Sequence, residues 1–341
     1  MDIDEVSTFD FPEDEFFGLE IHRNNVKYEF LVRLASKNDK LICFGGSGRV
    51  NQEKHDLPFF QRHSWQSKFE ESVIYYADPT FYLNSKLAAG WFLGTEDDWY
   101  LKTICKIIKN IVANRNIDNE NILHYGTSSS GFGAVMLATM IKGSTALVGN
   151  FNFNIFRVHI QSTIDNMKQF CFNGLDESTI IEKYGYRVNV VELFKKMEYV
   201  PPIIYHVNAH EDVDLIDQCI PFIESLGEAK INSFENDVEI LICHDNWGHK
   251  SRVTFIEAYP LIKLILERKM YKYYNTSRMQ PISYNEINKY KKIAEKSRTI
   301  IKKQNKTIEK YKSLKIIKIY EKLRKIKRSI KKSLKKSSNK N

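Results

Sequence analysis

A serine-rich turn, residues 126–131, is the part of this 341-residue chain whose residue types and spacing most clearly indicate chemistry. It stands between a predicted strand and a predicted helix. A strand that turns sharply into a helix needs small residues two before and two or three after its apex. With Ser129 at the apex, one of these positions would hold the bulky Phe132. With Ser128 there, all three are small: Gly126, Ser130 and Gly131. The pattern therefore favours Ser128, whose hydroxyl such a turn presents as a nucleophile.

A serine nucleophile needs a base, and the base needs a carboxylate that orients it. His249, in a polar loop after the last predicted strand, is the favoured base, and His244 is the alternative. The loop after the preceding strand supplies the acid. Asp212 is favoured there, and Asp214 or Glu211 could serve instead. Serine, acid and histidine thus each follow a strand of their own, in the order that accompanies a serine turn of this kind.

The negative charge that develops on a substrate carbonyl needs backbone N–H donors. Ser129 would supply one, since it begins the helix that follows the nucleophile. The turn after a short apolar strand, residues 44–48, is rich in glycine, which lets a backbone approach the substrate closely. Gly46, with Gly45 as its neighbour, is the expected second donor. An ordinary tight turn is the alternative interpretation.

Other kinds of site compete for the same residues. Gly126 and Gly131 have the spacing of a phosphate-binding loop, but Phe132 stands where that loop needs lysine. Asp212 and Asp214 form a D-x-D pair after a strand, the arrangement with which many glycosyltransferases hold a divalent metal and a sugar nucleotide. That interpretation leaves the serine turn unexplained, and we expect no bound metal. A serine turn without any chemistry is the remaining alternative.

Short apolar strands alternate with helices along most of the chain. Apolar residues recur with helical spacing between 97 and 113, and β-branched runs such as 72–76 and 203–207 indicate buried strands. This alternation predicts an α/β fold with a mostly parallel sheet that is covered on both faces. In such a sheet the loops that follow parallel strands meet at one edge. The serine, acid and histidine loops are therefore expected to lie together.

The net charge of +9 is divided unevenly along the chain. Residues 281–341 contain 22 Lys and Arg against four acidic residues, a net of +18, so the remainder carries −9. Apolar residues of this segment recur mostly at helical intervals, which predicts a basic amphipathic helical tail. We expect the tail to bind an anionic membrane surface or a glycan-assembly complex; docking on the body, or on a second copy, is the alternative. No recognition motif for specific nucleic-acid binding accompanies the charge.

Composition assigns the remaining segments. Residues 1–20 hold eight acidic residues and no Lys or Arg, and are expected to form a flexible arm. Residues 21–275 would form the catalytic domain, within which residues 151–200 are a candidate cap or lid. The five cysteines are scattered, which predicts buried thiols rather than disulfides or a zinc site. No leader or membrane span is apparent, so we expect a cytoplasmic protein.

The string from Tyr125 to Ala134 resembles the G-x-S-x-G nucleophile elbow of the α/β-hydrolase superfamily, with Ser130 in place of the last glycine. It is similar in particular to bacterial proteins of surface-glycan pathways. These include capsule O-acetyltransferases, related capsule-biosynthesis proteins, and accessory-secretion proteins that modify adhesin glycans. The resemblance spans roughly residues 40–260 and implies a three-layer α/β-hydrolase-like sandwich.

The same resemblance implies acyl transfer through a serine ester, as in O-acetylation of a bacterial surface polysaccharide during capsule biosynthesis. Ser128 would attack an acetyl donor such as acetyl-CoA, His249 would move the proton, and Asp212 would hold the imidazole. No cofactor would stay bound. An esterase of the same fold that acts on a carbohydrate or small-molecule ester is one alternative, and a non-catalytic scaffold in glycan export is another. The basic tail would place the protein on the inner face of the membrane.

Overall fold

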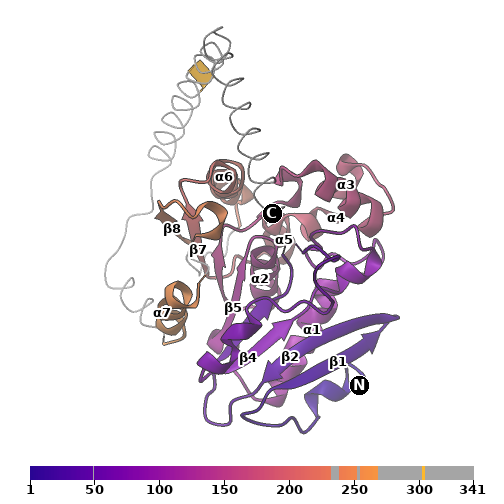
Figure 1. Ribbon diagram of the computed structural model, residues 1–341, viewed down its shortest axis with the longest axis vertical. Helices are drawn as coiled ribbons and strands as arrows, with labels where there is room; N and C mark the ends of the chain where they lie inside the picture. Colours follow the sequence, from indigo (N-terminus) through magenta and orange to yellow (C-terminus); the bar gives the residue numbers. More distant parts are fainter. Residues whose placement is uncertain (49, 232–237, 252–253, 268–301, 304–341) are drawn as a thin grey trace, which may run out of the picture. The chain divides into compact units, whose positions relative to one another are not determined.

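The computed structural model describes residues 1–48, 50–231, 238–251, 254–267 and 302–303 (Figure 1). The chain divides into two compact units, residues 1–271 and 272–341. The sheet and its helices belong to the first unit. The predicted basic tail, residues 281–341, lies outside the described residues, apart from residues 302 and 303.

A single sheet forms the centre of the first unit, and in the described residues it has eight strands in the order β1-β2-β4-β3-β5-β6-β7-β8 (Figure 1). β1 is antiparallel to β2 and β2 is antiparallel to β4, whereas the five remaining neighbouring pairs are parallel. The mostly parallel α/β sheet is therefore confirmed. The strands are β1 (Phe17–Arg23), β2 (Val26–Arg33), β3 (Leu41–Gly45), β4 (Ser72–Tyr76), β5 (Ile122–Thr127), β6 (Thr145–Gly149), β7 (Ile203–Asn208) and β8 (Val238–Cys243).

Helices cover both faces of this sheet and make it the middle of three layers. In one layer α1 packs on α2, α2 on α5 and α5 on α6. On the other face α7 packs beside the short helix η2, where the Trp65 and Phe255 rings meet edge to face. The α-helices are α1 (Tyr100–Asn114), α2 (Ser129–Met140), α3 (Gln161–Cys171), α4 (Glu177–Val188), α5 (Val190–Met197), α6 (Ile220–Ala229) and α7 (Phe255–Leu266). The shorter turns are η1 (Glu5–Ser7), η2 (His63–Lys68), η3 (Pro79–Leu83), η4 (Asn119–Asn121), η5 (Ile155–Arg157), η6 (Val213–Cys219) and η7 (Gly248–Lys250).

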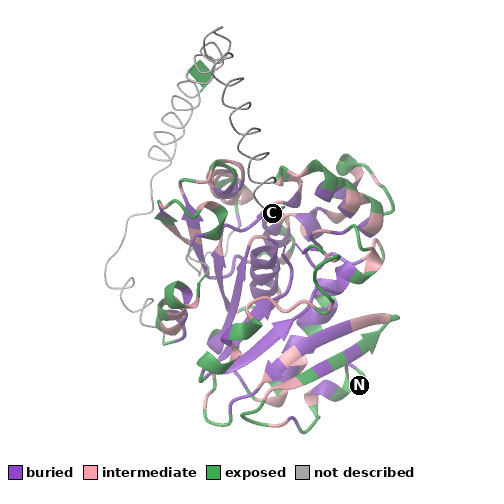
Figure 2. Ribbon diagram, in the orientation of Figure 1, coloured by how far each residue is buried: buried purple, intermediate pink, exposed green. Residues whose placement is uncertain are grey.

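The core lies between the sheet and its helices, as the buried central strands and helix α2 in Figure 2 show. Every residue of β3 and of β4 is buried, because strands covered on both faces must be apolar along their whole length. All five cysteines are buried and free, as the sequence predicts. This packing fixes the carboxyl ends of the strands from which the candidate site projects.

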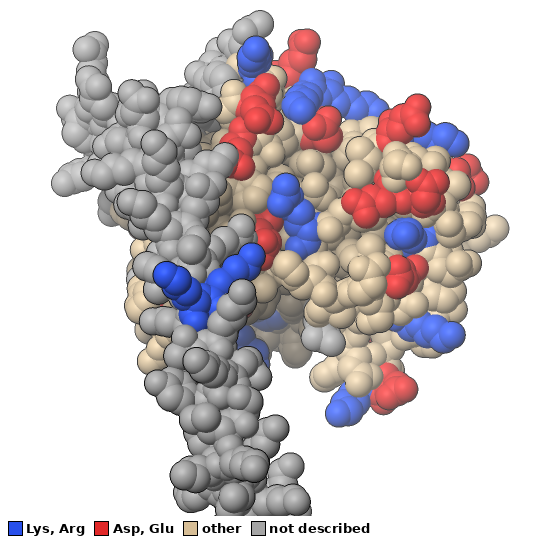
Figure 3. Space-filling view, turned by 90° about the horizontal axis from the view of Figure 1, so that it is seen from above, with Lys and Arg blue, Asp and Glu red and all other residues tan. Residues whose placement is uncertain are grey.

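Charged side chains of both signs are interspersed on the face of the molecule seen in Figure 3. The net negative charge of the body is thus not gathered into a patch of one sign on this face. No helix among the described residues has the length and apolar character needed to cross a membrane.

The first twenty residues do not behave as the flexible arm that their acidity suggested. Ile3, Val6 and Phe11 are buried in the main core. Asn110 of α1 donates a hydrogen bond to the Ile3 carbonyl at 2.7 Å, and Asn114 donates to the Phe9 carbonyl at 2.9 Å. The apolar residues spaced between the acids outweigh the charge, and the chain then enters β1, an edge strand that the sequence analysis missed.

The segment proposed as a cap, residues 151–200, forms the three helices α3, α4 and α5 between β6 and β7. Of these, α5 packs on α2 and belongs to the helical layer. Arg187 of α4 donates hydrogen bonds to the Leu93 and Thr95 carbonyls, which ties α4 to the loop before α1. That α3 and α4 close over the site stays a prediction.

Candidate active site

Ser128 lies at the turn between β5 and α2 in a strained backbone conformation, with φ 55° and ψ −129°. Its N–H donates a hydrogen bond to the Gly149 carbonyl at 3.2 Å, and its side chain is partly exposed between buried neighbours. A Cβ placed on Gly126 would lie 2.3 Å from the Ser130 carbonyl oxygen, and one on Gly131 would lie 2.5 Å from the Phe151 Cβ. The turn therefore requires the small residues from which the sequence analysis located it.

Ser130, which stands where the elbow motif has glycine, uses its hydroxyl to close the turn. The Ser130 Oγ accepts a hydrogen bond from the Thr127 N–H at 3.0 Å and lies 2.8 Å from the Thr127 carbonyl. It also lies 3.0 Å from the Gln61 Oε1, which accepts from it. The departure from the motif thus links the elbow to the segment between β3 and η2.

His249 is oriented by a buried carboxylate. Its Nδ1 lies 2.8 Å from both carboxylate oxygens of Asp214, whose side chain is 2% exposed while that of His249 is 46% exposed. The favoured acid, Asp212, is exposed and precedes the short π-helical segment η6, in which Asp214 faces inward. The preference for Asp212 is therefore corrected to the alternative, Asp214. The other candidate base, His244, instead stacks its ring on that of His210, with 5.1 Å between centroids.

The charge of Asp214 also sets the protonation of the imidazole. Its hydrogen bond raises the pKa of His249, partial burial of the ring opposes this, and the charges of Asp214 and Glu211 add to the rise. A raised pKa makes His249 a stronger base toward a hydroxyl proton. The neutral form that can accept the proton is present above that pKa.

The loops that carry Ser128 and His249 are both hydrogen-bonded to the end of β6. The Ser128 N–H binds the Gly149 carbonyl, and the side chain of the next residue, Asn150, donates to the His249 carbonyl at 3.0 Å. No hydrogen bond joins the Ser128 hydroxyl to the imidazole among the residues that the structure describes. In enzymes without substrate this bond is often long and tightens when substrate binds.

Two asparagines that the sequence analysis did not select hold the three loops together. Asn150, after β6, accepts a hydrogen bond at its Oδ1 from the Asn208 N–H at 3.0 Å, and its own N–H donates to the His206 carbonyl. Asn208, the last residue of β7, donates from Nδ2 to the Asp245 carbonyl at 3.0 Å in the histidine loop. Each lies at the end of a buried strand or directly after it, as Ser128 does, and that placement was the available signal.

The glycine turn after β3 serves packing as well as approach. The Gly46 N–H donates to the Tyr76 carbonyl at 2.7 Å, so this group is engaged in the sheet and is not an available oxyanion donor. Gly45 is a residue of β3 that pairs with Tyr76. A Cβ on Gly46 would lie 2.2 Å from the Phe59 carbonyl oxygen, so glycine is needed for close approach of the next segment. Ser129 begins α2, and its N–H has no acceptor within the helix, as an oxyanion donor requires.

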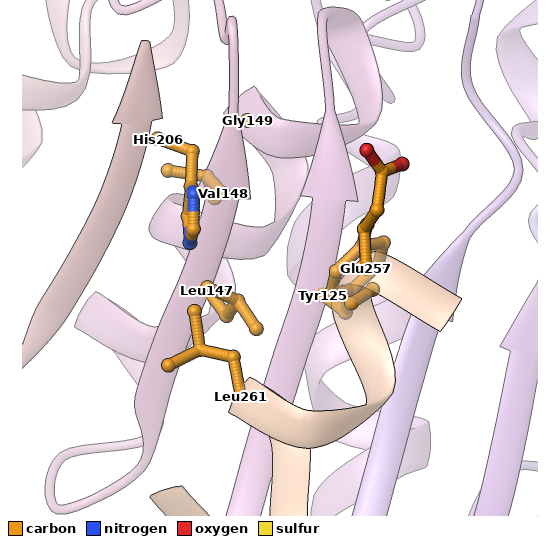
Figure 4. A pocket seen from close by; sticks show the side chains of 8 residues that line it. Tyr125, Leu147, Val148, Gly149, His206, Glu257 and Leu261 are labelled. Atoms are coloured by element: carbon orange, nitrogen blue, oxygen red, sulfur yellow. The ribbon is translucent and has the colours of Figure 1, made fainter. Parts of the chain in front are cut away.

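A small pocket lies on the face of the sheet under α7, beside the ends of β5, β6 and β7 (Figure 4). Gly149, whose carbonyl binds the Ser128 N–H, lines it together with His206 and Glu257. The described residues contain no group of three or more His, Cys, Asp or Glu side chains that could hold a metal ion. The remaining residues that line the pocket are Tyr125, Leu147, Val148, Ala258 and Leu261.

The strand order and the positions of the three side chains define an α/β-hydrolase fold. A serine follows β5, an acid follows β7 and a histidine follows β8, the chain order of this fold. No protein-family model and no curated protein matches the sequence.

Several solved structures share the fold. The capsule O-acetyltransferase of Neisseria meningitidis serogroup A has a TM-score of 0.55 and 15% identity, over 72% of this chain and 93% of that one. FphF, a fluorophosphonate-binding serine hydrolase of Staphylococcus aureus, has a TM-score of 0.51 and 12% identity, over 75% and 99%. An S-formylglutathione hydrolase from Agrobacterium tumefaciens has a TM-score of 0.50 and 13% identity, over 74% and 94%. The chain therefore shares its fold with an acyltransferase and with serine hydrolases.

Proposed function

We propose that this protein transfers acyl groups through a serine ester, with Ser128 as nucleophile, His249 as base and Asp214 as the orienting acid. The observation that carries the proposal is the 2.8 Å contact between His249 and the buried Asp214 carboxylate. A buried carboxylate that binds only the Nδ1 of an imidazole fixes its tautomer and leaves Nε2 to accept a proton.

The chemistry follows from these three roles. Ser128 Oγ attacks the carbonyl carbon of the acyl donor while its proton passes to His249 Nε2, and the carbonyl oxygen becomes an oxyanion. The Ser129 N–H at the start of α2 stabilises that charge. The tetrahedral intermediate then expels the leaving group, which takes the proton from His249, and an acyl-serine remains. An acceptor hydroxyl, deprotonated by His249, attacks this ester and regenerates Ser128.

The favoured reaction is O-acetylation of a bacterial surface polysaccharide, in line with the likeness to the meningococcal capsule O-acetyltransferase. A mutant of that protein is known in complex with CoA, which supports acetyl-CoA as the donor here. Hydrolysis is the second candidate, because two serine hydrolases are similar as well. The two reactions share the acyl-enzyme and differ in whether water or a sugar hydroxyl reaches it.

The glycosyltransferase interpretation loses its main support. Both carboxylate oxygens of Asp214 contact His249 in the interior, whereas Asp212 is exposed. The two acids therefore do not present carboxylates to one point, as a shared metal ion would need.

Mass spectrometry of the intact protein after incubation with acetyl-CoA tests the proposal. We expect one added acetyl group on Ser128, lost in Ser128→Ala and retained in Ser144→Ala, a buried serine whose hydroxyl binds the Ile141 carbonyl. Covalent labelling by an uncharged fluorophosphonate should follow the same pattern. Labelling that survives in Ser128→Ala would contradict the assignment, and no labelling of the wild type would favour the non-catalytic scaffold.

A further inference from the structure

Arg62 brings a positive charge beside the nucleophile. Its Nη2 donates a hydrogen bond at 2.8 Å to the hydroxyl of Thr127, the residue directly before Ser128. The guanidinium lies over two aromatic rings, 5.4 Å from the centroid of Trp65 and 5.0 Å from that of Tyr125. Burial raises the pKa of the Tyr125 hydroxyl, and the Arg62 charge opposes that rise. Stacking of this kind fixes the plane of the guanidinium.

A ring of hydrogen bonds holds Arg62 to the elbow. Gln61 Oε1 accepts from Arg62 Nη1 at 2.7 Å and from the Ser130 hydroxyl at 3.0 Å. Ser130 is the residue that replaces the last glycine of the elbow motif. The backbone of Arg62 is left-handed, with φ 61°, a conformation that a non-glycine residue adopts at a cost. These hydrogen bonds hold the Arg62 side chain against the nucleophile elbow.

The charge of Arg62 has no acidic partner within the part of the chain that the structure describes. Its terminal nitrogens donate to the neutral side chains of Gln61 and Thr127, and it also interacts with the neutral Tyr125 hydroxyl. Its Nε is buried without a hydrogen-bond partner. The acid that acts on the same ring of Tyr125, Glu257, is bound instead by the Thr254 hydroxyl at 2.7 Å.

Two other partly buried arginines have an acidic partner or backbone carbonyl partners instead. Arg115 lies 2.5 Å from the Glu13 carboxylate. Arg33 donates to the Phe69 and Glu71 carbonyls at 2.5 and 2.7 Å and makes no hydrogen bond to the elbow among the described residues. A cation without an acidic partner, in a body of net negative charge, is therefore hydrogen-bonded to the residue that directly precedes the candidate nucleophile.

We propose that Arg62 binds an anionic group, a phosphate or a carboxylate, of the substrate whose reacting carbon meets Ser128. This inference rests on the proposed function. A rigid guanidinium fork is the group that best matches such oxyanions, and an incoming anion would supply the missing counter-charge. The anion has two sources of the same chemistry: the phosphates of a CoA-type donor or an acidic sugar of the acceptor. The anionic group thereby positions the reacting end over the elbow.

Protection of Ser128 from an uncharged fluorophosphonate measures this subsite, with CoA and glucuronate as separate probes. We expect one of them to slow labelling of the wild type. Arg62→Met should raise the probe concentration needed to slow labelling by about 10- to 100-fold. Arg62→Lys should raise it by less, since lysine keeps the charge and loses the planar fork of the guanidinium. In the matched control Arg33→Met, the probe should protect Ser128 at the same concentration as in the wild type. Thermal unfolding of each variant verifies that it is folded.

Each outcome decides the inference. Protection by CoA assigns the subsite to the donor, and protection by glucuronate assigns it to the acceptor. No protection by either probe, or protection that both Arg62 variants leave unchanged, would overturn it. If the wild type is not labelled at all, the proposed function fails separately. Calorimetric titration with pyrophosphate then tests Arg62 alone: weaker binding by Arg62→Met supports the anion site, and equal or absent binding overturns it.

Discussion

The contact between Asp214 and His249 determines the pH at which the candidate base is available. Asp214 raises the pKa of His249, and only the neutral imidazole can take the Ser128 proton. The acyl-transfer rate, as kcat/KM, should therefore rise with pH through a pKa above the ordinary histidine value of about 6.5.

Removing the Asp214 charge should shift the pH range over which kcat/KM rises. In Asp214→Asn we expect this rise to occur at lower pH. The maximal kcat/KM reached above it should fall by as much as about 10⁴-fold, because the imidazole loses its orienting acceptor. Asp212→Asn, two residues away and exposed, is the matched control and should leave both unchanged. A larger loss in Asp212→Asn than in Asp214→Asn would restore Asp212 as the acid. The pH dependence of ester hydrolysis measures both variants.

A second histidine controls stability rather than activity. His124 of β5 is fully buried with no hydrogen-bond partner for either ring nitrogen, and this burial lowers its pKa to about 3. Because the unfolded chain binds the proton near pH 6.5, stability is lost as the pH falls below that value. The loss from this residue should reach about 2 kcal/mol at pH 5.

Urea unfolding at pH 7 and pH 5 tests the role of His124. His124→Leu should lose less stability between these values than the wild type, whereas the exposed His55→Leu should lose as much. His249 acts in the opposite direction, since its raised pKa gives stability that is present below pH 6.5 and lost as the pH rises through that pKa. An equal loss in wild type and His124→Leu would show that His124 is not the titrating group.

At the scale of elements, three loops reach the site from three strands and must be held in register. Asn150 joins the β7 and β8 loops to the end of β6 by hydrogen bonds to Asn208 and to the His249 carbonyl. Asn150→Ala should lower kcat by about 10- to 100-fold with a smaller change in KM, because small misplacement of reacting groups is costly. Asn173→Ala, at an exposed turn, is the control. An unchanged kcat in Asn150→Ala would mean that the loops hold their places without it.

The sequence predicted which strands and helices form better than it predicted which of their groups are available in the site. Alternating apolar strands and helices indicate an α/β sheet, and small residues around Ser128 locate the elbow because sterics demand them. The choice between Asp212 and Asp214 depends on which side of a π-helical turn faces inward, and residues two apart face different ways. The Gly46 N–H is taken by the sheet register with Tyr76, which no local pattern reveals.

At the scale of the whole molecule, charge and apolar residues gave different indications for the two ends of the chain. The acidic first twenty residues are held by Ile3, Val6 and Phe11, because burial of apolar side chains, at roughly 25 cal/mol per Å², outweighs screened surface repulsion. Apolar residues recur in the basic segment as well, among 22 Lys and Arg. In that segment charge dominates, and we propose that it binds an anionic membrane surface.

Co-sedimentation with vesicles tests the basic segment. The full chain should sediment with vesicles that contain phosphatidylserine and not with neutral ones, because each Lys or Arg near an anionic surface contributes about 1 kcal/mol. Deletion of residues 281–341, which removes a net charge of +18, should abolish sedimentation and leave fluorophosphonate labelling of Ser128 intact, since the body forms its own compact unit. Raising the salt concentration should weaken binding of the full chain. If the shortened chain still sediments, the body itself carries the membrane contact, and the division of the protein into a reacting body and a locating tail is wrong.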